Sequence, residues 1–532
     1  MSENDVSRGS AGGSPFPGDE FPVRERIPAV PPEMNSGLLA KYSFLNFLGM
    51  AVPALTGLVT LPVVIRWLGT ERMGVFFWIM VVMGYFGLFE LNLSRAMVKY
   101  VSEALGRKEF ARIPKIFWSI VAFQGVSGLI GGVALVLLAP TLVARFLKMP
   151  PALLPEATAA LAWMGVALPV NIILPSFRGV LEAAHRFDLV NLIKIPTNSA
   201  VFIIPLIGAV LQMDLKGIII LFVITRVVSL AFWAAAGGRT FPGLFRLGFL
   251  SRSDLRRVYA FGGWNMLFSM LWPVLSSFDR IFIGAQLGAK SVGFYAPASE
   301  GINKLGLIPG SLQLALFPAF SLLAANPVAT KAKDLFAKAV KYTILTMGPL
   351  VVLIIVFARW ILQTWLGGEY AQTSTLVLQI LAGSYLLQAL ASVPFSFLQG
   401  LGRADVTSVV LMIETAVIIP VFVLFIKFWG IAGAAAAVGF RSGLEVTLLV
   451  SSSRKRGGFD KASVAKENIV RLLLALSALA VWSLVWGRMI NGLPGFLAVG
   501  AAVAAFAVFA WARVLDEEER SRLRHFVLRT KG

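Results

Sequence analysis

The sequence contains no cysteine and only two histidines, His185 and His525, in 532 residues. A chain without cysteine has no disulfide, no thiolate metal site and no thiol nucleophile. Two histidines leave little material for a metal centre or for imidazole acid–base chemistry. We therefore expect no metal, no cofactor and no catalytic residue, and we interpret the chain as a protein that is not an enzyme.

Charged residues are also scarce. Asp, Glu, Lys and Arg make up 14% of the chain and hydrophobic residues 57%, with a mean hydropathy of +0.78. Soluble domains carry about a quarter charged residues, so most of this chain must face a solvent other than water. We predict an all-α polytopic membrane protein.

Apolar runs between charged, proline or glycine breaks predict about fourteen spanning helices, each needing roughly 20 apolar residues. The expected positions are near residues 41–66, 74–98, 114–139, 155–178, 188–211, 216–236, 259–285, 291–322, 340–365, 374–400, 404–427, 430–451, 468–486 and 492–513. No connection between them is long enough for a folded extramembrane domain. This disfavours membrane glycosyltransferases, polymerases and ligases, which usually display acids on sizeable outer loops.

The chain has 48 Lys and Arg against 28 Asp and Glu, a formal net charge of +20. The cations gather in one set of alternate loops, around residues 99–115, 178–186, 239–257, 331–341, 403 and 454–466. The positive-inside rule then places both termini in the cytoplasm. The cationic excess therefore indicates the membrane surface as its partner and not nucleic acid.

The first 36 residues differ from the rest. They contain six prolines, Pro15, Pro17, Pro22, Pro28, Pro31 and Pro32, among Gly, Ser and acidic residues. Such a segment buries too little apolar surface to fold, and we expect it to be a disordered cytoplasmic tail. It lacks a basic region followed by an apolar core and cleavage site, so the first spanning helix is expected to act as the insertion signal.

The chain resembles itself at an offset of 219 residues. Leu68-Gly69 and Gly74-Val75-Phe76 return as Leu287-Gly288 and Gly293-Phe294-Tyr295, Asn46 returns as Asn265, and Pro175 returns as Pro394. Several matches at one offset indicate a duplication of six helices. Because six is even, both copies enter the membrane in the same direction, as in transporters with a site between two lobes.

These patterns predict five segments. We expect a cytoplasmic N-terminal tail at 1–36, an N-lobe of helices 1–6 at 37–238 and a C-lobe of helices 7–12 at 239–455. Two appended helices follow at 456–513, and a basic cytoplasmic C-terminal tail at 514–532.

The segment from Asn265 to Tyr295, with Asp279-Arg280 and Leu287-Gly288, resembles the recurrent stretch of polysaccharide-biosynthesis membrane proteins. The first-half stretch from Arg66 to Phe76 and the connection from Gly179 to Asn191 resemble the same proteins. Together they resemble Wzx-type O-antigen and exopolysaccharide flippases of the multidrug/oligosaccharidyl-lipid/polysaccharide exporter superfamily. The resemblance covers roughly residues 37–455.

The resemblance implies a flippase in the cytoplasmic (inner) membrane of a bacterium. It would translocate a polyprenyl-diphosphate-linked oligosaccharide by alternating access for cell-surface polysaccharide biosynthesis. The implied partners are the lipid-linked oligosaccharide, membrane lipids and other polysaccharide-assembly proteins. Two alternatives stay open: a flippase for lipid II that is similar to MurJ, and a cation-coupled multidrug exporter of the same superfamily.

Ionisable groups within spanning helices are costly and usually face a partner or a wet cavity. The resemblance implies a cavity lined largely by helices 1, 2, 7 and 8, and its candidates are Asn46, Glu90, Asn92, Arg95, Asn265, Asp279, Arg280, Glu300 and Lys304. The cations would bind the diphosphate and the asparagines the sugar. Glu90, Glu414 and Glu445 are candidates for ion coupling. Glu300 and Lys304, and likewise Arg441 and Glu445, are four residues apart and could instead pair with each other.

Overall fold

A computed structural model describes residues 36–90, 92–252, 275, 277–325, 329–457, 469–489 and 493–521. The regular secondary structure in these ranges is entirely helical, which confirms the all-α prediction. Within them, ten helices are long and apolar enough to cross a membrane. The count of about fourteen stays a prediction, because much of the expected helix at 259–285 lies outside the described residues. Most of the two expected tails, 1–36 and 514–532, also lies outside them.

The first half of the chain forms α1 to α6. Their bounds are α1 Ser36–Phe86, a 3-10 helix Gly87–Glu90, α2 Leu93–Gly106, α3 Arg112–Phe146, a 3-10 helix Pro151–Leu153, α4 Leu154–Ala183, α5 Phe187–Val210 and α6 Leu215–Thr240. The runs expected near 114–139, 155–178, 188–211 and 216–236 became α3 to α6, and the first run became the first arm of α1. The helix expected at 74–98 is instead divided among the second arm of α1, the 3-10 helix and α2.

The second half forms α9 to α17. Residues 277–287 are helical, and then come α9 Ala289–Asn303, a 3-10 helix Lys304–Gly306, α10 Leu307–Ala325, α11 Ala329–Trp365, α12 Gly368–Thr373, α13 Thr375–Gly400 and α14 Ala404–Gly457. After them lie α16 Ile469–Met489, α17 Leu493–Phe509 and a π-helical turn Ala510–Val514.

Glycines with left-handed backbone separate the arms of the long helices. In α1 the helix is broken at Gly69, with φ 80° and ψ 158°, and in α14 at Gly430, with φ 56°. Gly288 has φ 93° and ψ 174° just before α9. Side chains other than glycine rarely adopt this region, which explains why glycine follows leucine at both Leu-Gly positions.

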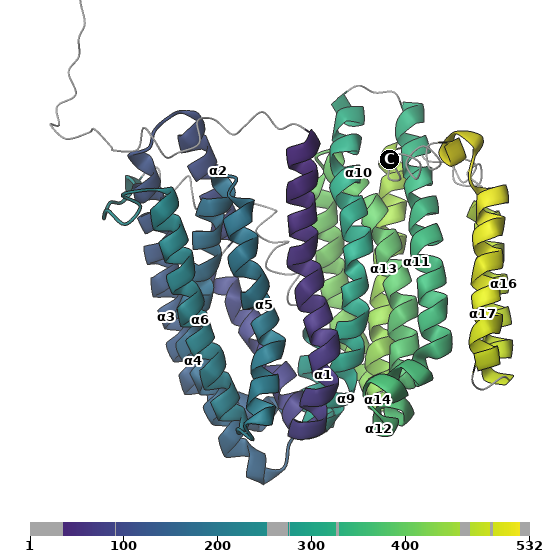
Figure 1. Ribbon diagram of the computed structural model, residues 1–532, viewed down its shortest axis with the longest axis horizontal. Helices are drawn as coiled ribbons and strands as arrows, with labels where there is room; N and C mark the ends of the chain where they lie inside the picture. The colour runs from purple at the N-terminus through teal and green to yellow at the C-terminus, as the bar shows by residue number, and fades with distance from the viewer. Residues whose placement is uncertain are drawn as a thin grey trace, which may run out of the picture.

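The helices form two groups (Figure 1). Figure 1 shows α2 to α6 together on one side, and α10, α11, α13 and α14 on the other, with α1 between them. The helices α16 and α17 lie at the far edge of the second group. There they share an apolar cluster with α11 that includes Ile344, Leu472 and Phe506.

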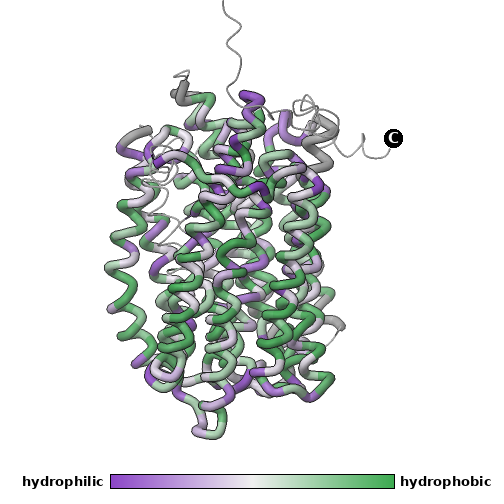
Figure 2. Tube along the Cα trace, turned by 90° about the vertical axis from the view of Figure 1, so that its left-hand side faces the viewer, coloured by the Kyte–Doolittle hydropathy of each residue, from purple (hydrophilic) through white to green (hydrophobic). Residues whose placement is uncertain are grey.

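Hydrophobic residues follow the middle of the helices and hydrophilic residues gather towards their two ends (Figure 2). The exposed surface of the central stretches is apolar, as Leu58, Leu137, Phe232 and Val423 illustrate. This is the pattern of helices whose outer faces meet lipid, and it indicates where the bilayer lies.

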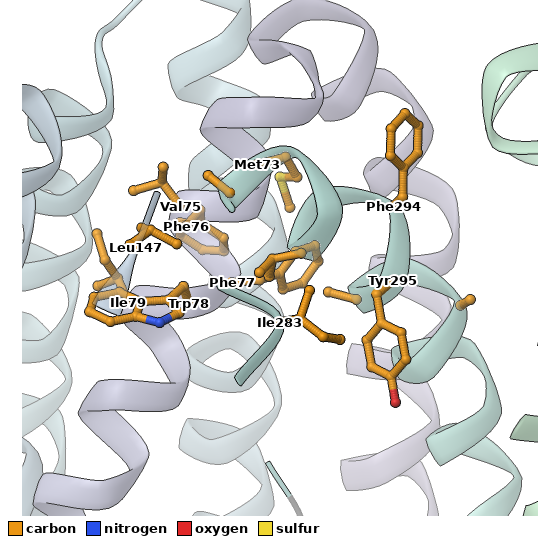
Figure 3. Close-up of a cluster of buried hydrophobic side chains, with 14 of the residues drawn as sticks. Met73, Val75, Phe76, Phe77, Trp78, Ile79, Leu147, Ile283, Phe294 and Tyr295 are labelled. Atoms are coloured by element: carbon orange, nitrogen blue, oxygen red, sulfur yellow. The ribbon is translucent and has the colours of Figure 1, made fainter. Parts of the chain in front are cut away.

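The largest core cluster joins the two groups (Figure 3). It contains Trp78 and Phe76 from the second arm of α1, Leu147 from the end of α3, and Ile283 and Tyr295 from the second half of the chain. Trp78 is 1% exposed and Tyr295 is fully buried. The two groups therefore share a packed core where the second arm of α1 lies beside α9.

Candidate functional site

A cavity of about 580 Å³ lies mainly within the second group of helices. Its walls come from α2, the helical segment 277–287, α9, α10, α13 and both arms of α14. Five of the predicted cavity or coupling residues from the second half line it, namely Asp279, Arg280, Glu300, Glu414 and Glu445, and so does Arg95 of α2.

Arg280 is paired within the cavity wall. Its Nη2 donates to Glu300 Oε1 at 2.8 Å, and its backbone N–H donates to Asp279 Oδ1 at 2.9 Å. Lys304 Nζ lies 3.5 Å from the other Glu300 oxygen, so the expected pair four residues apart is present. Glu300 thus serves two cations, and the network binds α9 to the helix before it.

A second charged group joins the two arms of α14. Arg441 Nη1 lies 3.8 Å from Glu414 Oε2, at the outer limit for an ion pair. Within the described residues no ion pair forms between Arg441 and Glu445, which differs from the pairing that their spacing suggested. The reason is the bend at Gly430, which folds the two arms of α14 together and turns Arg441 towards Glu414.

The wall contributed by α13 is polar but uncharged. Ser384, Gln388 and Ser392 line the cavity and recur every four residues, so they share one face of the helix. Tyr385 lies beside them on the same wall. Sequence reasoning missed this face. The spacing of four was visible, but serine in a spanning helix commonly bonds to its own backbone, as Ser384 does to Ile380 O at 2.7 Å.

The candidates of the first half occupy different places. Arg95 is exposed in the cavity wall. Glu90 ends the 3-10 helix before α2, and its Oε1 accepts the backbone N–H of Ser94 at 3.4 Å. Asn92 caps α2 in the left-handed conformation, with φ 58°.

Asn46 does not line this cavity. Its Oδ1 accepts a hydrogen bond from Nδ2 of buried Asn191 in α5 at 3.3 Å, which is a contact between helices. Its counterpart Asn265 lies outside the described residues. The structure therefore groups Arg95 with the acids and arginines of the second half and leaves Asn46 apart from them.

The chain matches known proteins both in sequence and in fold. A family model described as "Polysaccharide biosynthesis protein" matches residues 63–375, more than half of the chain. The chain belongs to the polysaccharide biosynthesis protein family. The resemblance to Wzx-type flippases, inferred from the two Leu-Gly stretches and the connection after Gly179, is confirmed.

Relatives of this family member come from bacteria and archaea. It is similar to "Putative O-antigen transporter" of Shigella flexneri, with 26% identity over 77% of the chain and 96% of the relative. It is also similar to "Probable low-salt glycan biosynthesis flippase" of Haloferax volcanii, with 24% identity over 72% of the chain and 76% of the relative. Both relatives carry the names of transport proteins, one of a transporter and the other of a flippase.

Two solved structures share the fold. One is an inward-facing multidrug-resistance transporter of the MATE family, with a TM-score of 0.66 and 14% identity over 77% of this chain and 98% of that one. The other is the lipid II flippase MurJ in an inward closed conformation, with a TM-score of 0.66 and 12% identity over 88% and 99%. At such low identity these likenesses show the fold alone. With the apolar helices, they establish a multi-pass membrane protein.

Proposed function

We propose that this protein is a flippase for a polyprenyl-diphosphate-linked oligosaccharide, moving it across the cytoplasmic membrane for cell-surface polysaccharide biosynthesis. The observation that carries this proposal is the cavity, where charged and hydroxyl groups are enclosed by helices with apolar outer faces. Polar groups at membrane depth are costly and mark the path of a polar cargo. The family and the relatives in S. flexneri and H. volcanii support a glycan as that cargo.

Two lobes built from parallel six-helix repeats are part of the proposal. Equivalent turns support them: Arg186 pairs with Asp188 at 2.9 Å before α5, and Arg403 pairs with Asp405 at 2.8 Å before α14. In each turn the arginine N–H donates to the carbonyl five residues earlier, at 3.0 and 2.9 Å, and the preceding residue has a positive φ.

Contacts between the groups are reciprocal, which also supports a repeat. A Cβ added to Gly74 would collide with the backbone of Ala289, and a Cβ added to Gly293 would collide with the backbone of Thr70. Each member of one contact lies 219 residues from its counterpart in the other. An approximate two-fold axis through this contact, along the membrane normal, accounts for the exchange.

The same end of the molecule carries backbone bonds between the two halves. Lys148, after α3, donates its N–H to Gly284 O at 3.2 Å and accepts the N–H of Ala289 at 2.8 Å. In α11, Trp365 Nε1 donates to Leu58 O of α1 at 2.7 Å. Most of these segments belong to the other set of alternate loops, which holds few cations. The positive-inside rule assigns that set to the outside. Alternating access would therefore require this outer contact to open.

Among the three cations proposed for the diphosphate, Arg95 is the best placed. Arg280 and Lys304 share the carboxylate of Glu300, whereas Arg95 forms no ion pair with a described residue. Lys304 Nζ also lies 5.7 Å above the Phe202 ring of α5, so it faces the first half of the chain. We propose that the diphosphate binds between Arg95 and Lys304, where the two groups of helices meet.

Ion coupling is assigned to carboxylates. Glu90, Glu414 and Glu445 remain the candidates, and their surroundings differ. Glu414 has Arg441 within 3.8 Å, a positive charge that a coupling cation would have to displace. Glu90 is half-buried and forms no ion pair with a described residue. We therefore place coupling at Glu90 first.

The test is a reconstitution. Proteoliposomes receive a fluorescent polyprenyl diphosphate carrying a short oligosaccharide, and an outside lectin reports how much glycan reaches the outer leaflet. Protein-dependent exposure is expected. Arg95→Gln should slow it by about tenfold or more, because a charge-assisted bond to phosphate is lost. Arg66→Gln, an exposed arginine of α1, is the matched control and should keep the rate.

The same preparation identifies the failure of the proposal. Exposure of the glycan at the rate of protein-free liposomes, with folded protein present, contradicts a flippase. Efflux of ethidium that depends on Asp279 would assign the protein to cation export instead.

A further inference from the structure

The cavity wall contains buried hydrogen-bonding atoms that form no hydrogen bond with a described residue. They include Glu414 Oε2, Arg441 Nη1 and Glu445 Oε2. The three residues are only 1%, 5% and 9% exposed. Leaving buried donors and acceptors unpaired is costly, so native structures that keep such atoms usually offer them to a ligand or to ordered water.

Amide side chains extend this polar wall. Gln388 of α13, Gln313 of α10 and Asn303 of α9 line the cavity, and none has a side-chain hydrogen bond with another described residue. An amide presents donors and an acceptor at once. The cavity therefore offers both kinds of hydrogen-bonding group on several of its walls, within a volume typical of small-ligand sites.

The charge of the wall does not suit a diphosphate. Acids slightly outnumber cations among the lining residues, which are Asp279, Glu300, Glu414 and Glu445 against Arg95, Arg280 and Arg441. Most of these cations already lie beside an acid. A ligand that enters this cavity is consequently expected to be polar and close to neutral.

A monovalent cation fits the same atoms less well. It would satisfy the oxygens of Glu414 and Glu445, but it would leave Arg441 Nη1 unpaired and would lie close to its positive charge. A sugar hydroxyl both donates and accepts. Hydroxyl groups can therefore donate to the two carboxylates and accept from the arginine at the same time.

We propose that this cavity is a sugar-binding pocket. It receives the first sugar residue of the lipid-linked cargo, while the diphosphate stays at Arg95 and Lys304 and the lipid tail stays in the bilayer. The proposal rests on the flippase function proposed above. It assigns recognition of the sugar to Gln388, Arg441 and Glu445.

The test measures binding of three lipids to the full-length protein in nanodiscs. The probes are bare polyprenyl diphosphate, the same lipid with one hexose, and the same lipid with one N-acetylhexosamine. The wild-type protein should bind at least one sugar-bearing lipid about tenfold more tightly than the bare lipid, which equals roughly 1.4 kcal/mol. Gln388→Leu and the near-isosteric Glu445→Gln should each reduce this preference severalfold and leave the affinity for the bare lipid unchanged.

Asn171→Leu is the control, because among the described residues this amide of α4 bonds only to Ala167 O of its own helix. It should keep the wild-type preference. A wild-type protein that binds all three lipids equally overturns the sugar pocket and leaves the flippase proposal standing. Variants that weaken all three lipids alike, or that alter only the response to sodium or pH, also overturn the pocket. Failure to bind any of the lipids contradicts the flippase function itself.

Discussion

The two groups of helices have similar turns before α5 and before α14 but bury different polar groups. In the first group, Gln124 and Ser176 form a neutral buried hydrogen bond of 2.7 Å between α3 and α4. In the second group, Arg280 and Glu300 instead form an ion pair of 2.8 Å, in which Arg280 is buried and Glu300 is partly buried. The two groups therefore differ in the polar groups that they bury, and the cavity lies mainly in the group with buried ion pairs.

The first group also holds two half-buried cations, in α5 and α6, that have no acidic partner at ion-pair distance among the described residues. The guanidinium of Arg226 in α6 lies 4.5 Å above the Phe222 ring. Lys194 in α5 is half-buried. Neither forms an ion pair within 4 Å of a described acid. The comparison teaches that the first group holds half-buried cations without an ion pair among the described residues, whereas the buried cations Arg280 and Arg441 of the second group each lie beside an acid.

The largest expected effect comes from removing the shared acid of the second group. Glu300→Gln leaves Arg280 buried without its closest carboxylate, and the loss should be about 3–5 kcal/mol of unfolding free energy. Chemical unfolding in detergent micelles measures it. Glu369→Gln, which removes an exposed partner of Lys290, should cost less than about 1 kcal/mol. Equal losses for the two variants would remove the distinction between buried and surface ions.

A smaller effect is expected where the groups touch. Gly293→Ala places a methyl group against the backbone of Thr70, and such overpacking costs about 1–3 kcal/mol. The outer contact should open more often. A cysteine introduced at Leu147, which is only 1% exposed in this contact, should then react with an external maleimide at least about fivefold faster. Gly84→Ala, with no atom within 4 Å of the added carbon, should leave the labelling rate unchanged.

A third prediction concerns the edge of the second group. Glu519 Oε1 accepts from the Tyr342 hydroxyl at 2.6 Å, and its Oε2 accepts from Lys341 Nζ at 2.9 Å. Burial raises the pKa of Glu519, but these hydrogen bonds outweigh it and keep the pKa below its ordinary value. Their stabilisation is therefore present above the ordinary carboxyl pKa of about 4.3 and is lost as the pH falls through the lower folded value.

Hydrogen exchange of residues 515–521 checks this docking. The protection of these amides from exchange should persist at neutral pH. It should decline only in acid, where the free energy of opening the segment falls by about 1 kcal/mol. Glu519→Gln should weaken the protection at neutral pH to about the level that the wild-type protein reaches in acid, and should abolish its pH dependence. If neither acid nor the substitution changes the protection from exchange, apolar packing alone holds this segment.

The smallest expected effects concern the similar turns before α5 and before α14. Arg186→Ala and Arg403→Ala each remove an exposed pair with an aspartate two residues later. Both should cost less than about 1 kcal/mol and by similar amounts, because surface ion pairs contribute little. Thermal unfolding of the two variants side by side measures the difference. A cost several times larger in one turn would mean that the turns are not equivalent.

The fold class followed from the sequence because bilayer helices need long apolar runs that composition reveals directly. The breaks at Gly69 and Gly288 also lie between expected helices, at the two Leu-Gly positions that match at an offset of 219. The pair of Glu300 and Lys304 was predictable from its spacing of four, which brings both side chains to one face of a helix.

The rest depended on contacts between distant segments. Nothing local indicates that Arg441 faces Glu414, because that contact depends on how the arms of α14 meet after Gly430. The place of Asn46 beside Asn191, outside the cavity, is set by the packing of α1 on α5. Long-range geometry of this kind leaves no periodic signal in one sequence.

Cross-linking the outer contact tests alternating access most directly. The chain has no native cysteine, so Lys148→Cys with Gln286→Cys supplies one pair, at a site where Lys148 Nζ lies 3.1 Å from Gln286 O. Joining them with a short cleavable linker should stop the transfer of lipid-linked oligosaccharide in proteoliposomes, and cleaving the linker should restore it. Transfer that continues at the full rate in completely cross-linked protein would contradict the account.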